Sequence, residues 1–260
     1  MADVVGLDTF VSHFEGHEES YVLIGGAACS LWLGAQGLPF RRTRDLDIVI
    51  VIEGTSDEFF QLLWQFIEDG NYRSRERGTA KPQFYRFYDP ASVDYPYMIE
   101  LLTRNLLELP DSAHLTPMPI GEEISSLSAI LLEDTYYQFV LDNRQQIQGA
   151  TTIPGHCLIP LKAKAWLDLT GRRNDGDETV RSNDIRKHRN DVFRLLIAIP
   201  PADRIPMPSL IRDDLRLFLE KVSADEVTWT SIEAAVNATS PNALPNRNES
   251  IDLIEKIFKL

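Results

Sequence analysis

Near the start of the chain, some apolar residues form short continuous runs and others recur at helical spacing. This pattern predicts strands packed against helices. One apolar run leads directly into Gly25-Gly26, as a buried strand does before a turn. Strands are expected over 21–24, 45–52, 83–88 and 97–103. Helices are expected over 27–34 and from a cap at Thr55 or Ser56 to Gly70. This mixed order indicates an α/β or α+β core, and we expect α+β.

The pattern changes to a helical one in the second half of the chain. Pro110, Pro117 and Pro119 mark a shift in composition. We therefore expect a sheet-containing core over 1–115 and a mostly helical lobe over 116–260. Its helices are expected at 134–147, 158–170, 184–198, 209–222 and 250–259.

Composition places the chain among ordinary globular proteins. Its 260 residues are 43% apolar and 25% charged. The sequence contains no run of about 18 apolar residues, so no membrane span is predicted. The first residues lack a basic segment followed by an apolar one, which argues against export. Cys29 and Cys157 lie beside apolar residues and fit reduced core thiols. We therefore expect a cytoplasmic protein.

The charge balance disfavours binding of nucleic acid through a broad positively charged surface. There are 26 basic and 39 acidic residues, giving a net charge of −13. The basic residues are nevertheless clustered, so a local basic groove and scattered solvated faces both fit the pattern. The arginines that could line one groove are Arg41, Arg42, Arg44, Arg172, Arg173, Arg186 and Arg189.

Candidate chemistry centres on Asp45 and Asp47, at alternate positions of the second strand. Side chains alternate along a strand, so these two carboxylates share a face while Leu46 points to the core. Paired carboxylates repel each other unless a cation lies between them, and hard oxygen ligands suit Mg²⁺. Gly25 and Gly26 offer backbone N–H groups near a helix start, where a phosphate binds without steric hindrance. The pattern predicts nucleotidyl transfer.

The same residues resemble a known superfamily. The order of these features is a strand, a diglycine, a helix and then Asp45-Leu46-Asp47. This order resembles that of the DNA polymerase β-type nucleotidyltransferases. Within that superfamily, the segment from Arg41 through Thr43 to Asp47 resembles the first motif of the AbiEii/MenT family, toxins of type IV toxin–antitoxin systems. The stretches 161–169 and 190–195 are similar to its later motifs. Asn190 stands where the family often has Lys, and Arg194 where it has an acidic residue.

The resemblance implies a fold and an activity. It implies a nucleotidyltransferase fold, a helical lobe that closes the nucleotide cleft, and two Mg²⁺ ions used to transfer a nucleoside monophosphate from an NTP. It places Gly25, Gly26, Arg41 and Thr43 at the nucleotide. It further suggests tRNA as the hydroxyl acceptor and a separately encoded antitoxin as a protein partner.

Glu100 is the expected third metal ligand. It is an acidic residue within an apolar strand, where a carboxylate is costly unless it is paired or bound to metal. An edge-strand glutamate facing solvent is the alternative reading. If Glu100 faces away from the diglycine, Asp94 becomes the candidate ligand.

Helix geometry separates two lysines of the second lobe. Lys162 falls within the apolar stripe of its helix and predicts an anionic partner such as a triphosphate, although snorkelling to the surface would also satisfy it. Lys164 falls beside Asp168 as a surface pair. Asp191 lies at the edge of the next apolar stripe, one turn after Lys187. It either supports its helix or, as the family likeness suggests, is an active-site group that orients the lysine or assists the acceptor.

Two other functions remain open at this stage. The acidic net charge suits a small cationic acceptor, so a nucleotidyltransferase acting on a small hydroxylated molecule, such as an antibiotic, is one alternative. A catalytically inactive binding module is the other, although the acidic positions in place argue against it.

Overall fold

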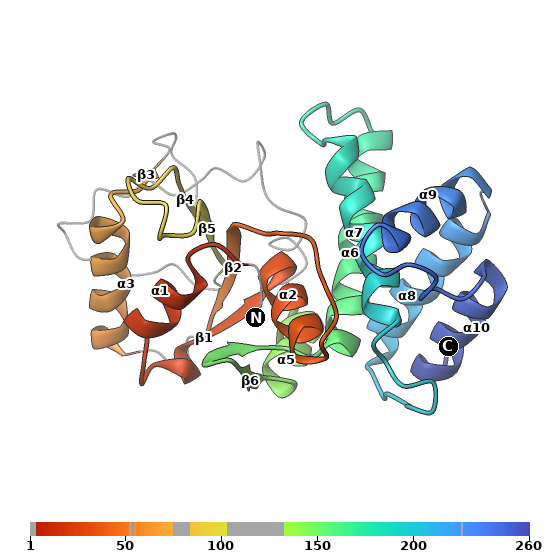
Figure 1. The fold of residues 1–260 in the computed structure, drawn as a ribbon, viewed down its shortest axis with the longest axis horizontal. Helices are drawn as coiled ribbons and strands as arrows, with labels where there is room; N and C mark the ends of the chain where they lie inside the picture. The colour runs from red at the N-terminus through yellow and green to blue at the C-terminus, as the bar shows by residue number, and fades with distance from the viewer. Residues whose placement is uncertain (1–3, 52–53, 55, 75–83, 103–132, 225) are drawn as a thin grey trace.

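The computed structural model describes residues 4–51, 54, 56–74, 84–102, 133–224 and 226–260. Its elements build a sheet with flanking helices, followed by a group of helices (Figure 1). The described helices up to residue 142 are α1 (Leu7–His13), η1 (Glu18–Ser20), α2 (Gly25–Ala35), α3 (Asp57–Asp69) and α5 (Asp134–Asp142). Those that follow are α6 (Gly155–Asn174), α7 (Ser182–Leu196), α8 (Ser209–Ser223), α9 (Glu226–Asn237) and α10 (Arg247–Phe258).

A mixed sheet of seven strands forms the frame, in the order β3-β4-β5-β2-β1-β7-β6. The strands are β1 (Tyr21–Ile24), β2 (Asp45–Ile50), β3 (Arg73–Ser74), β4 (Phe84–Tyr88), β5 (Met98–Leu102), β6 (Gln145–Ile147) and β7 (Ala150–Thr152). β2 runs antiparallel to β1 and parallel to β5, and β5 is antiparallel to β4. The expected α+β fold with a mostly helical C-terminal part is confirmed.

Side-chain alternation divides the core into two layers, one on each face of the sheet. Leu46 and Ile48 point to the layer that contains α1 and α3. Val49 and Leu102 point to the other layer, which contains α2, α5, α6 and the C-terminal helices. The site residues of β2 and β5 share this second face, so they lie between the sheet and the helical half of the molecule.

Several boundaries match the predicted ones. Ser56 caps α3, since its side chain accepts a hydrogen bond from the Phe59 N–H at 3.2 Å, and Gly70 follows the last helical residue. The helix expected from 27 begins at Gly25 instead, and those expected at 158–170 and 184–198 are α6 and α7. None of the helices in the described ranges is long and apolar enough to cross a membrane.

One predicted helix is wrong in part. The segment 134–147 forms α5 only as far as Asp142, and its last residues form β6 of a hairpin with β7. Gln148 and Gly149 both have positive φ, as the tight turn of a hairpin requires. The boundary expected at 115/116 lies outside the described residues and stays a prediction. The β6–β7 hairpin adds two strands from beyond that point to the sheet.

Candidate active site

Asp45 and Asp47 are placed on one face of the sheet by β2, as predicted. The residue between them, Leu46, is fully buried in the opposite layer. Both carboxylates are partly buried, and one oxygen of Asp45, Oδ1, is buried without a hydrogen-bond partner in the described structure. A carboxylate oxygen in that state favours a cation beside it.

The diglycine lies against Asp47 at the start of α2. Gly25 has φ of +67°, and a Cβ added there would lie 1.8 Å from Oδ2 of Asp47. A Cβ on Gly26 would lie 3.0 Å from Oγ1 of the buried Thr43. Both glycines therefore let the N-terminus of α2, with its free N–H groups, approach the carboxylate closely. The role of this helix start as a phosphate cradle stays a prediction.

Glu100 lies on the strand beside Asp47 and shares its face. The parallel pairing of β2 and β5 sets Asp47 opposite Glu100, and Glu100 is only 6% exposed. It is therefore not a solvent-facing edge residue. Arg86 of β4 pairs with it from the other side, donating from Nε to Oε1 at 2.6 Å and contacting the same oxygen through Nη2. Asp94 is exposed in the loop before β5.

Burial and mutual repulsion shape the electrostatics of these carboxyl groups. Burial, followed by the charge of Glu100, raises the pKa of Asp47 to about 8. Burial also raises the pKa of Asp45. Within the described residues, no three His, Cys, Asp or Glu side chains come together closely enough to form a metal site by themselves. Asp45 and Asp47 fit a hard cation that also takes ligands from elsewhere, whereas Glu100 already has a cationic partner.

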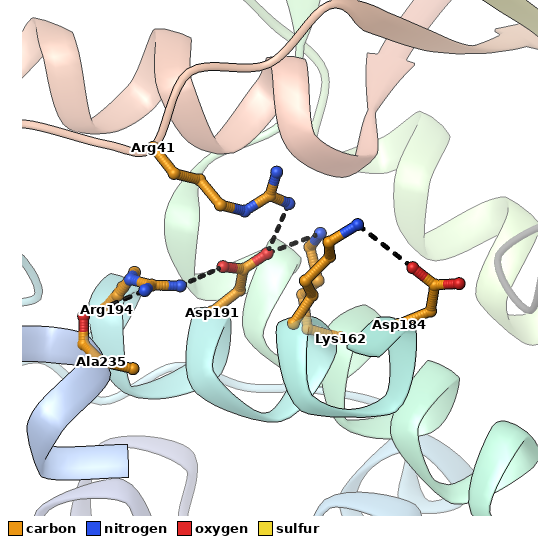
Figure 2. A network of polar contacts seen from close by, with 7 residues as sticks. Arg41, Lys162, Asp184, Asp191, Arg194 and Ala235 are labelled. Atoms are coloured by element: carbon orange, nitrogen blue, oxygen red, sulfur yellow. Dashed lines mark hydrogen bonds and ion pairs between the residues drawn. The ribbon is translucent and has the colours of Figure 1, made fainter. Parts of the chain in front are cut away.

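Across from the sheet, Asp191 of α7 is fully buried and bound by three cationic side chains (Figure 2). Arg41 Nη2 and Lys162 Nζ each lie 3.2 Å from Oδ2, and Arg194 Nη1 lies 3.0 Å from Oδ1. Burial alone would raise the pKa of Asp191, but Lys162, Arg41 and Arg194 together lower it well below its usual range. Asp191 is therefore a fixed anion that positions cationic groups.

Lys162 is buried and points inward, as its place in the helical stripe predicted. Besides its ion pair with Asp191, its charge lowers the pKa of Asp47, so it acts electrostatically on the β2 carboxylate as well as on that of α7. Lys164 points elsewhere: its Nζ donates to Asp214 of α8 at 2.9 Å. Its ion-pair partner is therefore Asp214 and not the expected Asp168, because α8 covers this side of α6, although the charge of Lys164 still lowers the pKa of Asp168.

Sequence reasoning missed the roles of two arginines. Arg194 was noted only as a departure from the family pattern, yet it binds Asp191 and the Ala235 carbonyl at 2.9 Å. Its spacing of three residues from Asp191 on a helix was the available signal. Arg86 carried no such signal, because its pairing with Glu100 depends on the register of β4 against β5.

The arginines expected to line one groove have different neighbours. Arg41 turns inward to Asp191, while Cζ of Arg44 lies 3.9 Å from the centroid of the Tyr97 ring. Arg172 pairs with Asp177 at 2.7 Å, and Arg173 donates to the Val180 carbonyl. Arg189 is buried and donates to Ser231. Arg41 and Arg189 are therefore engaged inside the protein, and the groove expected to be formed by all seven arginines stays a prediction.

Comparison with known proteins adds one distant likeness. No protein-family model matches the sequence, and no curated protein is significantly similar to it. Among solved structures, the chain is similar to an antigenic nucleotidyltransferase-like protein from Paracoccidioides brasiliensis, with a TM-score of 0.42 and 16% sequence identity. The match covers 90% of this chain and 94% of that one. A likeness at this level assigns no function to the chain.

Proposed function

We propose that this protein is a Mg²⁺-dependent nucleotidyltransferase that moves a nucleoside monophosphate from an NTP to a hydroxyl acceptor. One observation carries the proposal: Asp45 and Asp47 share a sheet face against the N-terminus of α2, where Gly25 leaves no side chain in the way. Carboxylates for a metal and N–H groups for a phosphate thus lie together.

The donor set at Asp45 and Asp47 suits Mg²⁺. This ion commonly binds through one or two carboxylates, keeps several waters and takes further ligands from substrate phosphates. The unpartnered Oδ1 of Asp45 and the raised pKa of Asp47 both fit a cation held between these residues. Bound Mg²⁺ would activate the acceptor hydroxyl and offset the charge of the triphosphate.

Lys162 and Arg41 supply the positive charge that a triphosphate needs on the opposite side. Asp191 holds both, and Arg41 Nε is buried without an acceptor in the described part of the chain. The acceptor hydroxyl attacks the α-phosphorus and loses its proton, the bond to the β-phosphate oxygen breaks, and pyrophosphate leaves. Protein groups mainly position the reactants and neutralise charge.

We propose tRNA as the acceptor and a toxin role with a cognate antitoxin, in the cytoplasm, on the sequence resemblance given above. A specific observation favours a second candidate, a small hydroxylated acceptor. Arg172, Arg173 and Arg189 bind within their own lobe and leave fewer arginines for a nucleic-acid backbone. The net charge of −13 also suits a small cationic molecule.

Labelling decides between these acceptors. The protein is incubated with each α-³²P-labelled NTP and Mg²⁺, with total cellular RNA or with a small-molecule extract, and Asp47→Asn serves as the inactive control. RNA labelling that falls steeply between low and physiological salt supports tRNA, because phosphate contacts release counterions. A labelled small product formed at a nearly salt-independent rate supports the second candidate. No label transfer from any NTP to either pool would contradict the proposed function.

A further inference from the structure

Glu100 has a charged or ionisable neighbour on each side across the sheet. The antiparallel register of β4 and β5 places Arg86 opposite Glu100, and the parallel register of β5 and β2 places Asp47 opposite it. The carboxyl groups of Asp47 and Glu100 also lie within hydrogen-bonding range of each other, which contributes to the raised pKa of Asp47. Glu100 is therefore the middle member of a row, with a guanidinium on one side and a carboxyl group on the other.

The cationic partner of Glu100 contacts one of its two oxygens. Nε of Arg86 donates to Oε1 at 2.6 Å, and Nη2 contacts the same oxygen. The two side chains are 19% and 7% exposed, so the pair is screened less by solvent than a surface ion pair is. Because both contacts end on Oε1, Oε2 remains available on the side of Asp47.

A carboxylate that ligates a metal ion is commonly held in place by a hydrogen-bond partner behind it. We infer that Arg86 is a positioning residue: it holds Oε1 of Glu100 and so directs Oε2 toward the metal ion that Asp45 and Asp47 bind. A guanidinium suits this task, because it stays protonated at every physiological pH and presents its donors in a fixed plane. The inference rests on the proposed function, which supplies the divalent cation.

The charge of Arg86 acts in the opposite direction to its hydrogen bonds. A positive charge close to the site repels a cation, so its removal alone would tighten metal binding. Loss of the partner that orients a ligand instead weakens metal binding, typically by about 10–100-fold. The substitution Arg86→Met therefore separates the two effects by the sign of the change in metal affinity.

Titration with Mn²⁺ in the absence of nucleotide measures this sign. Free Mn²⁺ is followed by its electron paramagnetic resonance signal, and the binding that Asp47→Asn retains is subtracted as surface binding. Arg86→Met is expected to raise the Kd of the remaining site about tenfold, and Glu100→Gln by a similar factor. The double variant Arg86→Met/Glu100→Gln is expected to bind no more weakly than Glu100→Gln alone, because Arg86 acts through Glu100.

Two further variants keep the result interpretable if Arg86→Met does not fold. Arg86→Lys retains the positive charge but replaces the planar fork with a single ammonium group, so the Kd is expected to rise at least threefold. Arg73→Met removes an arginine that is 72% exposed on the neighbouring strand β3, and is expected to match wild type. Circular dichroism checks the fold of each variant.

Four results would overturn the inference and leave nucleotidyl transfer standing. They are unchanged or tighter Mn²⁺ binding by a folded Arg86→Met variant, wild-type affinity in Arg86→Lys, unchanged affinity in Glu100→Gln, and an undiminished effect of Arg86→Met in the Glu100→Gln background. The expected affinities together with no label transfer from any NTP would contradict the proposed function alone. Wild-type protein that binds no more Mn²⁺ than Asp47→Asn would contradict both.

Discussion

Arg41 and Asp191 are 150 residues apart in the sequence, yet Nη2 of the arginine lies 3.2 Å from Oδ2 of the aspartate. Arg41 belongs to the segment between α2 and β2, and Asp191 belongs to α7. Lys162 of α6 binds the same oxygen. One buried carboxylate therefore ties the segment before β2 to two helices of the C-terminal half and fixes where two cationic side chains lie.

Asp191→Asn is expected to destabilise the fold by about 3–5 kcal/mol at neutral pH, because buried cations lose their counter-charge. Since the pKa of Asp191 is lowered in the folded protein, its ionised form stabilises the fold above the ordinary value of about 4. That stabilisation is lost as the pH falls from there toward the folded-state pKa. Urea unfolding should give the same difference between wild type and variant at pH 7 and pH 5, and a smaller one at pH 3.

Asp213→Asn provides the matched control for this prediction. Asp213 pairs with Arg216 on the surface of α8 and its side chain is 68% exposed. Its replacement should change the free energy of unfolding by no more than about 0.5 kcal/mol. An equal loss from both variants would argue against a special role for the buried carboxylate.

Gly25→Ala is expected to abolish nucleotidyl transfer. The added Cβ meets the Asp47 carboxylate at 1.8 Å, and φ of +67° adds strain of roughly 1–2 kcal/mol. Gly37 has a similar φ of +73° with nothing within 4 Å of an added Cβ. Gly37→Ala should therefore lower the thermal unfolding temperature through the same backbone strain, while its nucleotidyl-transfer activity is retained. Activity retained in Gly25→Ala would show that the close approach to Asp47 is not needed.

Lys162→Ala should lower kcat/KM for the NTP at least tenfold, about 1.4 kcal/mol, because the buried ammonium is held by Asp191 and its charge also acts on Asp47. Lys164→Ala on the same helix should lower it little, since Lys164 bonds to Asp214 of α8. Steady-state kinetics of the two variants measure this difference. Comparable losses from both would refute the assignment of Lys162 to the nucleotide.

Asp45→Asn and Asp47→Asn are each expected to abolish Mg²⁺-dependent transfer while the protein stays folded. Each change removes one of two neighbouring carboxylates that repel each other without a cation, so stability in metal-free buffer should not fall. Asp252→Asn alters an exposed aspartate of α10 and serves as the control. Label transfer and thermal unfolding are measured side by side. Full activity of either site variant would exclude that residue as a metal ligand.

Local sequence patterns predict much of the fold and part of the candidate site. Strand alternation predicts the shared face of Asp45 and Asp47, and helical spacing predicts that Lys162 points inward. Contacts set by register or by distant packing could not be predicted in this way. Arg86 meets Glu100 only because β4 pairs with β5 in one particular register. Arg189 is buried against Ser231 of α9, a helix that the sequence pattern did not predict.

The pairing of β1 with β7 also governs how the chain can fold during synthesis. Thr152 Oγ1 donates to the Leu23 carbonyl, a contact that spans 129 residues. At translation rates of about 5–20 residues per second, β1 waits on the order of ten seconds for this neighbour. Until then, the nascent apolar run Tyr21–Ile24 has an unpaired edge that another chain can join. A chaperone that covers this edge during the interval would therefore reduce aggregation of the newly made chain.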